Sequence, residues 1–153
     1  MKTKIQPTVV FMLTVLSGAC SAESGASPNS LSIVGVWNQG ASLRDTVNSQ
    51  SHIHTGYFSF VQKRDGFAGT GEQSGLCTGT HGDYVGPLAT GKPFNLVDGI
   101  EEGDRVSFKS DLCTYEGTLS ADKAHIAGTA RCAYTEGGVS FVWVGDWLAN
   151  RER

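Results

Sequence analysis

The stretch LCTYEGTLSADKAHIAGTARCAY, residues 112–134, decides the fold. Its residues alternate in character on both sides of Asp122-Lys123, which is typical of two strands joined by a tight turn. If Asp122 and Lys123 form the turn, residues that face each other have numbers that add up to 245. Three of the resulting pairs match in kind: Leu119 faces Ile126, Gly117 faces Gly128 and Cys113 faces Cys132. This agreement predicts an antiparallel hairpin.

The same register predicts a disulfide between Cys113 and Cys132. Directly opposed residues have Cβ atoms about 4.5–5.5 Å apart, and a non-hydrogen-bonded pair comes close enough for an S–S bond. On the chain-entropy model, this bond stabilises the fold by roughly 3 kcal/mol. Cys77 is then free or paired elsewhere, and a small buried thiol is its simplest interpretation.

The period of two and the turn residues continue along the chain. Turns are expected at Arg64-Asp65-Gly66, Glu102-Gly103-Asp104 and Glu136-Gly137, because glycine favours hairpin turns. Residues 77–93 are expected to form the longest loop, and residues 42–45 could begin one helical turn. The expected strands cover residues 32–37, 57–62, 67–72, 94–97, 105–109, 112–119, 126–134 and 139–147.

The turn at Glu136-Gly137 sets the faces of the last strand. In this register Phe141 faces Cys132. Because side chains alternate along a strand, three aromatic residues then share the face of the disulfide: Phe141, Trp143 and Trp147.

Val106 and Phe108 are also expected to point inward, but they have even numbers whereas Cys113 has an odd number. On one continuous strand they would therefore lie on the opposite face from Cys113. A β-bulge between Ser110 and Leu112 would bring all three to one face. We therefore expect a bulge at this point.

The fold class follows from the number of strands and their turns. Seven or eight antiparallel strands with short turns and internal glycines predict an all-β fold, an up-and-down barrel of about eight strands, because closure removes exposed edges. A β-sandwich is the alternative. The barrel would form a single domain over residues 33–153.

Residues 1–22 have the three parts of an export signal. Lys2 and Lys4 give a positive start, Val9–Leu16 form an apolar run, and small residues follow at 17–22. The run is shorter than the ~20 residues that a transmembrane helix needs. We therefore expect the mature protein to work outside the cytoplasm, where disulfides persist.

Two cleavages are compatible with this signal. Leu16-Ser17-Gly18-Ala19-Cys20 resembles a bacterial lipobox, in which the cysteine becomes the lipidated first residue. The alternative is cleavage by signal peptidase I after Ala22. Residues 23–32 are small and polar, as in a flexible tether. The protein would then be an outer-membrane-anchored lipoprotein, periplasmic, or secreted.

Charge narrows the range of partners. Without Lys2 and Lys4, 10 basic residues stand against 15 acidic ones, and the net charge changes from −3 to −5. Nucleic acid and anionic membrane surfaces both attract clustered Lys and Arg, so neither is expected as a partner. Contact with a membrane would then come only through a lipid anchor.

Gly35-Val36-Trp37 at the first expected strand, with Arg151 just beyond the last, resembles the lipocalin-like (calycin) superfamily. In that superfamily a Gly-x-Trp strand closes the bottom of the barrel, and an arginine from the end of the chain packs over the tryptophan. The resemblance implies that Trp37 and Arg151 are structural residues. Arg153 is the alternative to Arg151 in this role.

His52-Ile53-His54 is the sharpest candidate for chemistry. Residues i and i+2 of a strand face the same side, so the two imidazoles could hold one metal ion. A third ligand would have to come from elsewhere, such as His81, His125 or Asp83. The simpler interpretation is two solvated histidines at the start of a strand. No motif of a nucleophile, a phosphate loop or a cofactor stands out, so we expect neither an enzyme nor a bound cofactor.

Aromatic residues suggest a different role. Barrels of about eight strands are filled by side chains or hold one small ligand. An interior of this kind would suit a lipid, a pigment or another hydrophobic small molecule. The aromatic residues expected to point inward are Trp37, Tyr57, Phe94, Phe108, Tyr115, Phe141 and Trp143.

The sequence thus favours an exported lipocalin-like barrel that binds a small hydrophobic ligand. The alternative is an envelope protein-interaction module, such as a hydrolase inhibitor or an assembly factor. That module would bind through loops at residues 75–93 and 98–104, since loops on a rigid scaffold often carry function. A metal enzyme at His52 and His54 ranks third.

Overall fold

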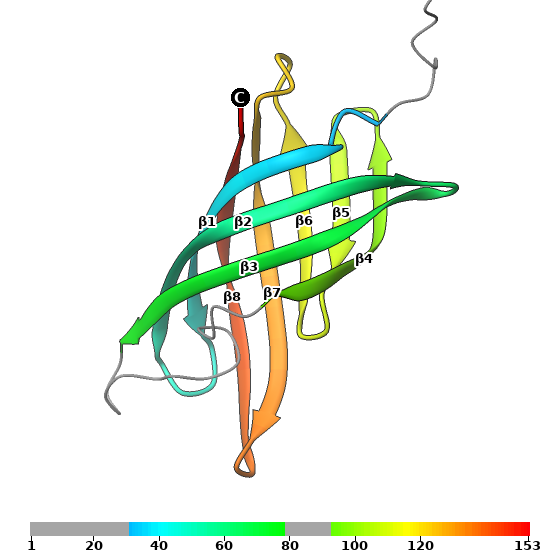
Figure 1. The fold of residues 1–153 in the computed structure, drawn as a ribbon. Helices are drawn as coiled ribbons and strands as arrows, with labels where there is room; N and C mark the ends of the chain where they lie inside the picture. Colours follow the sequence, from blue (N-terminus) through cyan, green and yellow to red (C-terminus); the bar gives the residue numbers. More distant parts are fainter. Residues whose placement is uncertain (1–30, 79–92) are drawn as a thin grey trace, which may run out of the picture.

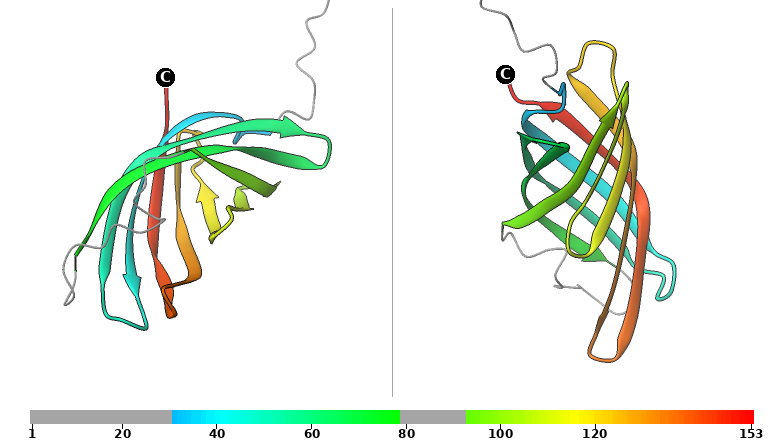
Figure 2. Two further views of the ribbon diagram at one scale, coloured as in Figure 1. Left: turned by 60° about the horizontal axis from the view of Figure 1, so that its bottom comes forward. Right: turned by 90° about the vertical axis from the view of Figure 1, so that its right-hand side faces the viewer.

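The computed structural model describes residues 31–78 and 93–153, which form one closed antiparallel barrel (Figures 1 and 2). The strands are β1 (Gly35–Asp45), β2 (Ser51–Lys63), β3 (Gly66–Thr78), β4 (Phe94–Glu102), β5 (Arg105–Lys109), β6 (Cys113–Leu119), β7 (His125–Glu136) and β8 (Val139–Arg151). Each strand pairs with its neighbours in the chain, and β8 pairs with β1 to close the ring. The expected up-and-down barrel is confirmed, and the β-sandwich is wrong. Within these residues, no helix has the length and apolar character needed to cross a membrane.

The hairpin of β6 and β7 has the register that its sequence predicts. All three matched pairs are present, including Cys113 opposite Cys132. These two cysteines form a disulfide with an S–S distance of 2.03 Å, which confirms the expected bond. At the turn, the Ser120 N–H donates to the carbonyl of His125 over 2.8 Å. The turn is therefore centred on Asp122-Lys123, as the register requires.

The hairpin of β7 and β8 differs from its expected register by two residues. Its turn is Gly137-Gly138, and Cys132 pairs with Trp143 instead of Phe141. Both glycines have a positive φ, 57° and 81°, as the central residues of a type I′ turn require. Glu136 would be strained there and ends β7 instead. A shift of two residues preserves parity, so Phe141 and Trp143 still face the interior with the disulfide.

Val106 and Phe108 reach the interior without a bulge. Residues 110–112 connect β5 to β6, which are separate antiparallel strands. Phe108 of β5 pairs with Tyr115 of β6. This register places even-numbered residues of β5 opposite odd-numbered residues of β6, so both sets point inward. The expected bulge between Ser110 and Leu112 is therefore wrong, because the chain reverses at that point.

Several strands are longer than the sequence suggests, and in β1 and β4 the extra length overturns an expectation. Along β1, burial alternates through Leu43 and Asp45, and the strand pairs on both sides up to its end. The helical turn considered at residues 42–45 is therefore wrong, since these backbone groups are already used in the sheet. Likewise, residues 98–102 belong to β4, and the loop expected at 98–104 reduces to the turn at Gly103-Asp104.

Trp37 and Arg151 close one end of the barrel, as the resemblance implies. The guanidinium carbon of Arg151 lies 4.3 Å from the centre of the Trp37 ring. Its N–H groups donate to the carbonyls of Ser32, Val34 and Lys123. Gly35 has a φ of 132°, and a Cβ there would lie 2.9 Å from Nη1 of Arg151. The glycine of Gly-x-Trp thus makes room for this arginine. We call this end of the barrel the closed end.

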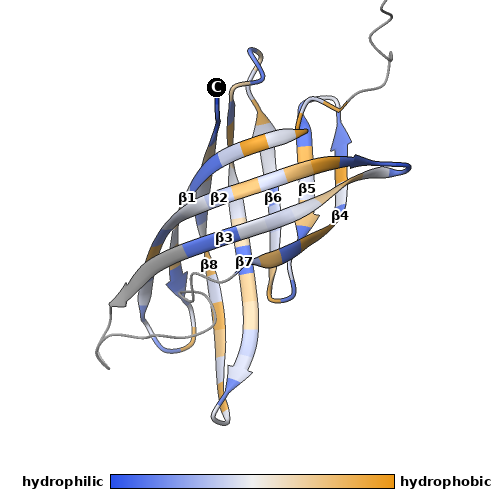
Figure 3. Cartoon of the chain, in the orientation of Figure 1, coloured by the Kyte–Doolittle hydropathy of each residue, from blue (hydrophilic) through white to orange (hydrophobic). Residues whose placement is uncertain are grey.

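Aromatic side chains fill the half of the interior next to the closed end. The ring of Phe58 lies 5.4–5.9 Å from those of Phe108, Tyr115 and Trp147, measured between ring centres. Phe108 and Tyr115 stack at 4.7 Å. Hydrophobic and hydrophilic residues alternate along the strands that carry these rings (Figure 3). This half of the barrel is a packed core.

Candidate functional site

The other half of the interior carries polar side chains. It lies towards the end where β1 is connected to β2 and β7 to β8 (Figure 1). Polar residues seldom occupy barrel interiors unless they have a partner. Five buried polar residues, none more than 6% exposed, form what we call the polar layer: Gln39, Gln50, His52, His54 and Gln73.

Strand β2 turns both histidines inward. His52 and His54 are 0% and 2% exposed, whereas Ile53 between them is 64% exposed. They share the parity of the buried Phe58 and Phe60 further along the strand. The expectation of two solvated histidines is therefore wrong, because the phenylalanines fix which face of β2 is buried.

Gln39 and Gln73 lie on either side of Gly56. Gly56 pairs with Gln39 across β1 and β2, and with Gln73 across β2 and β3. A Cβ on Gly56 would lie 1.9 Å from the carbonyl oxygen of Glu72, so the close approach of β3 requires glycine. In this row across three strands, only the outer two positions carry a side chain.

Several atoms of the polar layer have no hydrogen-bond partner among the described residues. They are both amide atoms of Gln39, Oε1 of Gln50 and both ring nitrogens of His54. An unpaired buried polar atom costs about 1–3 kcal/mol, and most such atoms in native proteins are paired. These groups are therefore available to a partner from outside the chain.

His54 is neutral at pH 7. Burial, and then the charge of nearby His52, lower the pKa of His54 from 6.5 to about 3. The two imidazole ring centres lie 4.9 Å apart. A neutral imidazole has one N–H donor and one lone pair, so His54 can both donate and accept a hydrogen bond.

Asp45 is buried near the same end but already has its partners. Its carboxylate accepts the backbone N–H groups of Val47, Asn48 and Val142 over 3.0–3.1 Å. Burial opposes its ionisation, but these hydrogen bonds and one from the Asn48 side chain lower the pKa of Asp45 below 3.8. Asp45 thus fixes the β1–β2 connection and is occupied by it.

Aromatic residues of β7 and β8 face the polar layer. Trp143 lies edge-on to His52, with ring centres 5.9 Å apart. Phe141 lies parallel to Trp143 at 6.4 Å and stacks on Tyr134 at 5.1 Å. The Trp143 Nε1–H donates to Tyr134 Oη over 3.2 Å. We call Tyr134, Phe141 and Trp143 the aromatic wall.

The aromatic residues expected to point inward differ in where the structure places them. Trp143 and Phe141 lie beside the polar layer, and Phe94 packs, partly buried, against the core. Trp37, Phe108 and Tyr115 belong to the packed half. Tyr57 lies on the outer face, 37% exposed, with its hydroxyl 3.1 Å from Glu72 Oε2. Its expected inward orientation is wrong, because the neighbouring Phe58 takes the interior position.

The sequence interpretation missed the three glutamines. Glutamine is usually exposed, so composition alone gives no reason to place it inside. The alternation of inward and outward residues along β1 predicts the burial of Gln39, since it is two residues from the buried Trp37 and shares its face. The same rule would have placed Gln73 with Phe67 on β3.

A complete metal site is absent from the described part of the chain. No group of three His, Cys, Asp or Glu side chains is close enough there to hold an ion. His125, considered as a third ligand, is exposed at the closed end and lies 2.7 Å from Asn150 Oδ1. The export signal at 1–22, Cys20, His81, Asp83 and most of the tether at 23–32 lie outside the described residues.

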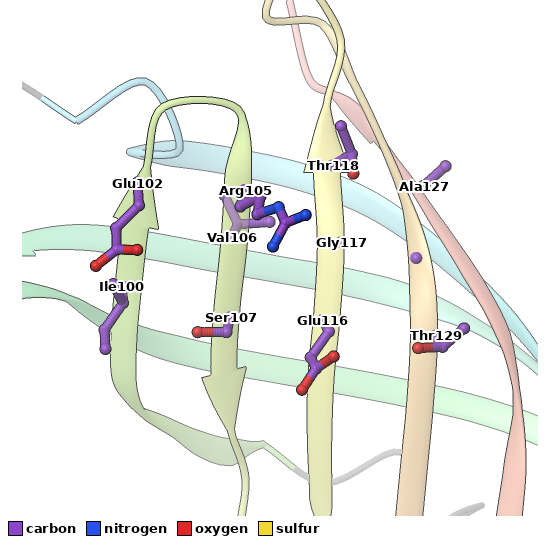
Figure 4. A pocket seen from close by; sticks show the side chains of 11 residues that line it. Ile100, Glu102, Arg105, Val106, Ser107, Glu116, Gly117, Thr118, Ala127 and Thr129 are labelled. Atoms are coloured by element: carbon purple, nitrogen blue, oxygen red, sulfur yellow. The ribbon is translucent and has the colours of Figure 1, made fainter.

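A groove of about 520 Å³ crosses the outer face of β4 to β7 (Figure 4). Gly117 and Gly128 pair at its floor. Glu102, Arg105 and Glu116 are its charged residues, and none of its lining residues is aromatic.

A second groove, of about 840 Å³, crosses the outer face of β1, β2 and β8. It brings Ile53, Tyr57 and Leu148 together, and Ile53 and Leu148 are 64% and 59% exposed. Large apolar side chains gathered on a surface often mark a contact site for another protein.

No family model and no curated protein matches the sequence. Among solved structures, the fold is similar to the zebrafish ileal bile acid-binding protein, whose crystal structure is complexed with cholic acid. The two share 12% identity at a TM-score of 0.33, over 80% of this chain and all of that one. The eight-stranded closed antiparallel barrel of this chain follows from its own strand pairing.

Proposed function

We propose that this protein is an exported barrel that binds a small hydrophobic ligand at the polar layer and does not catalyse a reaction. The observation that carries the proposal is the pair of buried residues, Gln39 and His54, whose polar atoms have no partner among the described residues. Ligand sites combine apolar walls with a few such polar groups that fix orientation. Both components are present at this end of the barrel.

The arrangement also indicates how the ligand lies. Its apolar body packs on Trp143 and Phe141 of β8, and its polar edge meets Gln39 and His54 on the adjoining strands β1 and β2. Gln39 and a neutral His54 each offer a donor and an acceptor. The carboxylate of Asp45 is already occupied. A ligand without formal charge, carrying both donors and acceptors, therefore suits the site best.

Export is part of this proposal. Residues 1–22 direct the chain out of the cytoplasm, and the Cys113–Cys132 disulfide fits an oxidising compartment. Lipidation at Cys20 would tether the barrel to the outer membrane through residues 23–32. Cleavage after Ala22 would instead leave it periplasmic or secreted.

The test compares one polar position inside the barrel with one outside it. The uncharged dye Nile red serves as the probe, and its fluorescence is titrated against wild type, Gln39→Met and Asn95→Met. Asn95 is exposed on β4, lines neither groove and gives the control. We expect Gln39→Met to weaken binding while raising the free energy of unfolding by about 1–2 kcal/mol, because an unpaired buried amide is removed. Asn95→Met should change neither.

Equal dye binding in all three proteins, or none in wild type, would contradict the proposal. The natural ligand is then sought by native mass spectrometry of protein from its own host. Extra mass that disappears on denaturation gives the mass of the ligand.

A protein partner is the second candidate, and the groove with Ile53, Tyr57 and Leu148 favours it. Exposed apolar groups at the centre of an interface bind strongly when a partner covers them. Crosslinking in host membranes with wild type and Leu148→Glu tests this candidate. A crosslinked partner that is lost in Leu148→Glu supports it, and identical patterns contradict it.

A further inference from the structure

We propose that His52 and His54 form a binding site for one divalent transition-metal ion, Zn²⁺ or Cu²⁺, inside the barrel. The inference goes beyond the proposed function and does not depend on it, because an ion needs the two imidazoles whether or not an organic ligand binds. The site would lie beside the aromatic wall.

The geometry of the pair carries the inference. A tetrahedral Zn²⁺ bound by two imidazole nitrogens at about 2.0–2.1 Å holds the two ring centres about 5 Å apart. The ring centres of His52 and His54 are 4.9 Å apart. Both side chains come from one strand at positions i and i+2, so the sheet fixes their separation without any movement of a loop. The separation of the two ring centres is thus the one that a shared ion requires.

The surroundings favour a metal over a purely structural role for His54. A buried imidazole in a protein core normally donates its N–H and accepts at its other nitrogen. Neither ring nitrogen of His54 has a partner among the described residues. His54 therefore has ring nitrogens that no described residue occupies.

The remaining positions around the ion would hold neutral oxygen ligands. Gln39 lies on the inward face of β1, two residues from Ala41, the residue that pairs with His54. Its Oε1 has no partner among the described residues. Asp45 is held by backbone N–H groups and is not available. Two imidazoles with amide or water oxygens make an open site, which Cu²⁺ binds more tightly than Zn²⁺.

The test titrates Zn²⁺ into the EDTA-treated full barrel by calorimetry. We expect one ion per chain in wild type, binding at least tenfold weaker in His54→Leu, and unchanged binding in His125→Ala. His125 is the matched control because it is an exposed histidine away from the interior. Binding should also persist in Cys77→Ser, which separates the imidazole site from metal capture by a thiol. Equal affinity in wild type and His54→Leu, or loss of binding in His125→Ala or Cys77→Ser, would overturn the assignment.

A second measurement needs no variant of the buried pair. In wild type labelled with ¹⁵N on histidine, Zn²⁺ should shift the ring nitrogens of two histidines, and Cu²⁺ should quench tryptophan fluorescence through Trp143, which contacts His52. The quenching should be much smaller in Trp143→Phe. Unchanged histidine spectra with Zn²⁺ would overturn the proposal even if His54→Leu failed to fold. Metal binding that persists without dye binding, or the reverse, separates this site from the proposed function.

Discussion

Replacing Arg151 by alanine should lower the free energy of unfolding by about 4 kcal/mol. The guanidinium donates hydrogen bonds to three carbonyls from two separate segments, at Ser32 and Val34 and at Lys123. It also lies 4.3 Å from the centre of the Trp37 ring. We take about 1 kcal/mol for each hydrogen bond, below the range for charged donors because the side chain is partly exposed, and about 1 kcal/mol for the cation–π contact.

Two control variants separate these contributions. Arg151→Lys keeps the charge but lacks the planar fork, so it should reach one carbonyl and recover about 1–2 kcal/mol of the loss. Arg153→Ala removes an exposed arginine two residues away and should change stability by less than about 0.5 kcal/mol.

The assay is urea unfolding followed by far-ultraviolet circular dichroism, which does not depend on the environment of Trp37. Hydrogen exchange should show faster exchange at residues 31–37 and in the β6–β7 turn of Arg151→Ala, and unchanged exchange in β7 near the disulfide. A loss below about 1 kcal/mol in Arg151→Ala, or an equal loss in Arg153→Ala, would refute the reasoning.

Other regions of the barrel give further expectations. Replacing Cys113 and Cys132 together by alanine should lower the free energy of unfolding by roughly 3 kcal/mol in oxidising buffer, and an unchanged urea midpoint would argue against this. Gly138→Ala has open space around its Cβ but needs a φ of 81°, so it should cost about 1 kcal/mol by thermal unfolding, and a gain in stability would contradict the turn assignment. In metal-free protein, unfolded His54 binds a proton below its ordinary pKa of 6.5, whereas the folded imidazole stays neutral down to about pH 3. The contribution of His54 to the free energy of unfolding is therefore fully present above its ordinary pKa and is lost as the pH is lowered, by about 2 kcal/mol from pH 7 to pH 5. In His54→Leu the free energy of unfolding should fall less steeply over this range.

The best-predicted part of the fold is the hairpin around Asp122-Lys123. There, paired residues of equal kind on both sides of one turn leave a single register, and the disulfide follows from it. In the next hairpin the expected turn is Glu136-Gly137, whereas the structure has Gly137-Gly138. Only the requirement for two positive φ values separates them, and that requirement depends on the twist of the finished sheet.

The candidate site was harder to predict than the fold. On β2, Tyr57 and Phe58 are both aromatic, so hydrophobicity alone does not say which one faces inward. Because Phe58 faces inward, His52 and His54 do so as well. The wrong prediction that Tyr57 faces inward therefore prevented recognition of the polar layer. Burial of Gln39 depends on the same alternation in β1, against the usual exposure of glutamine.

The seam between β1 and β8 has a consequence for how the chain folds. It pairs Trp37 with Arg151, more than a hundred positions apart, whereas the hairpins join near neighbours. Contacts of such separation form slowly, so the hairpins should assemble first and the ring should close last. Until β8 is in place, β1 has one unpaired edge, at which another chain can add. The interval before closure is therefore when the protein is most exposed to aggregation, and loss of the last strand would make that state permanent.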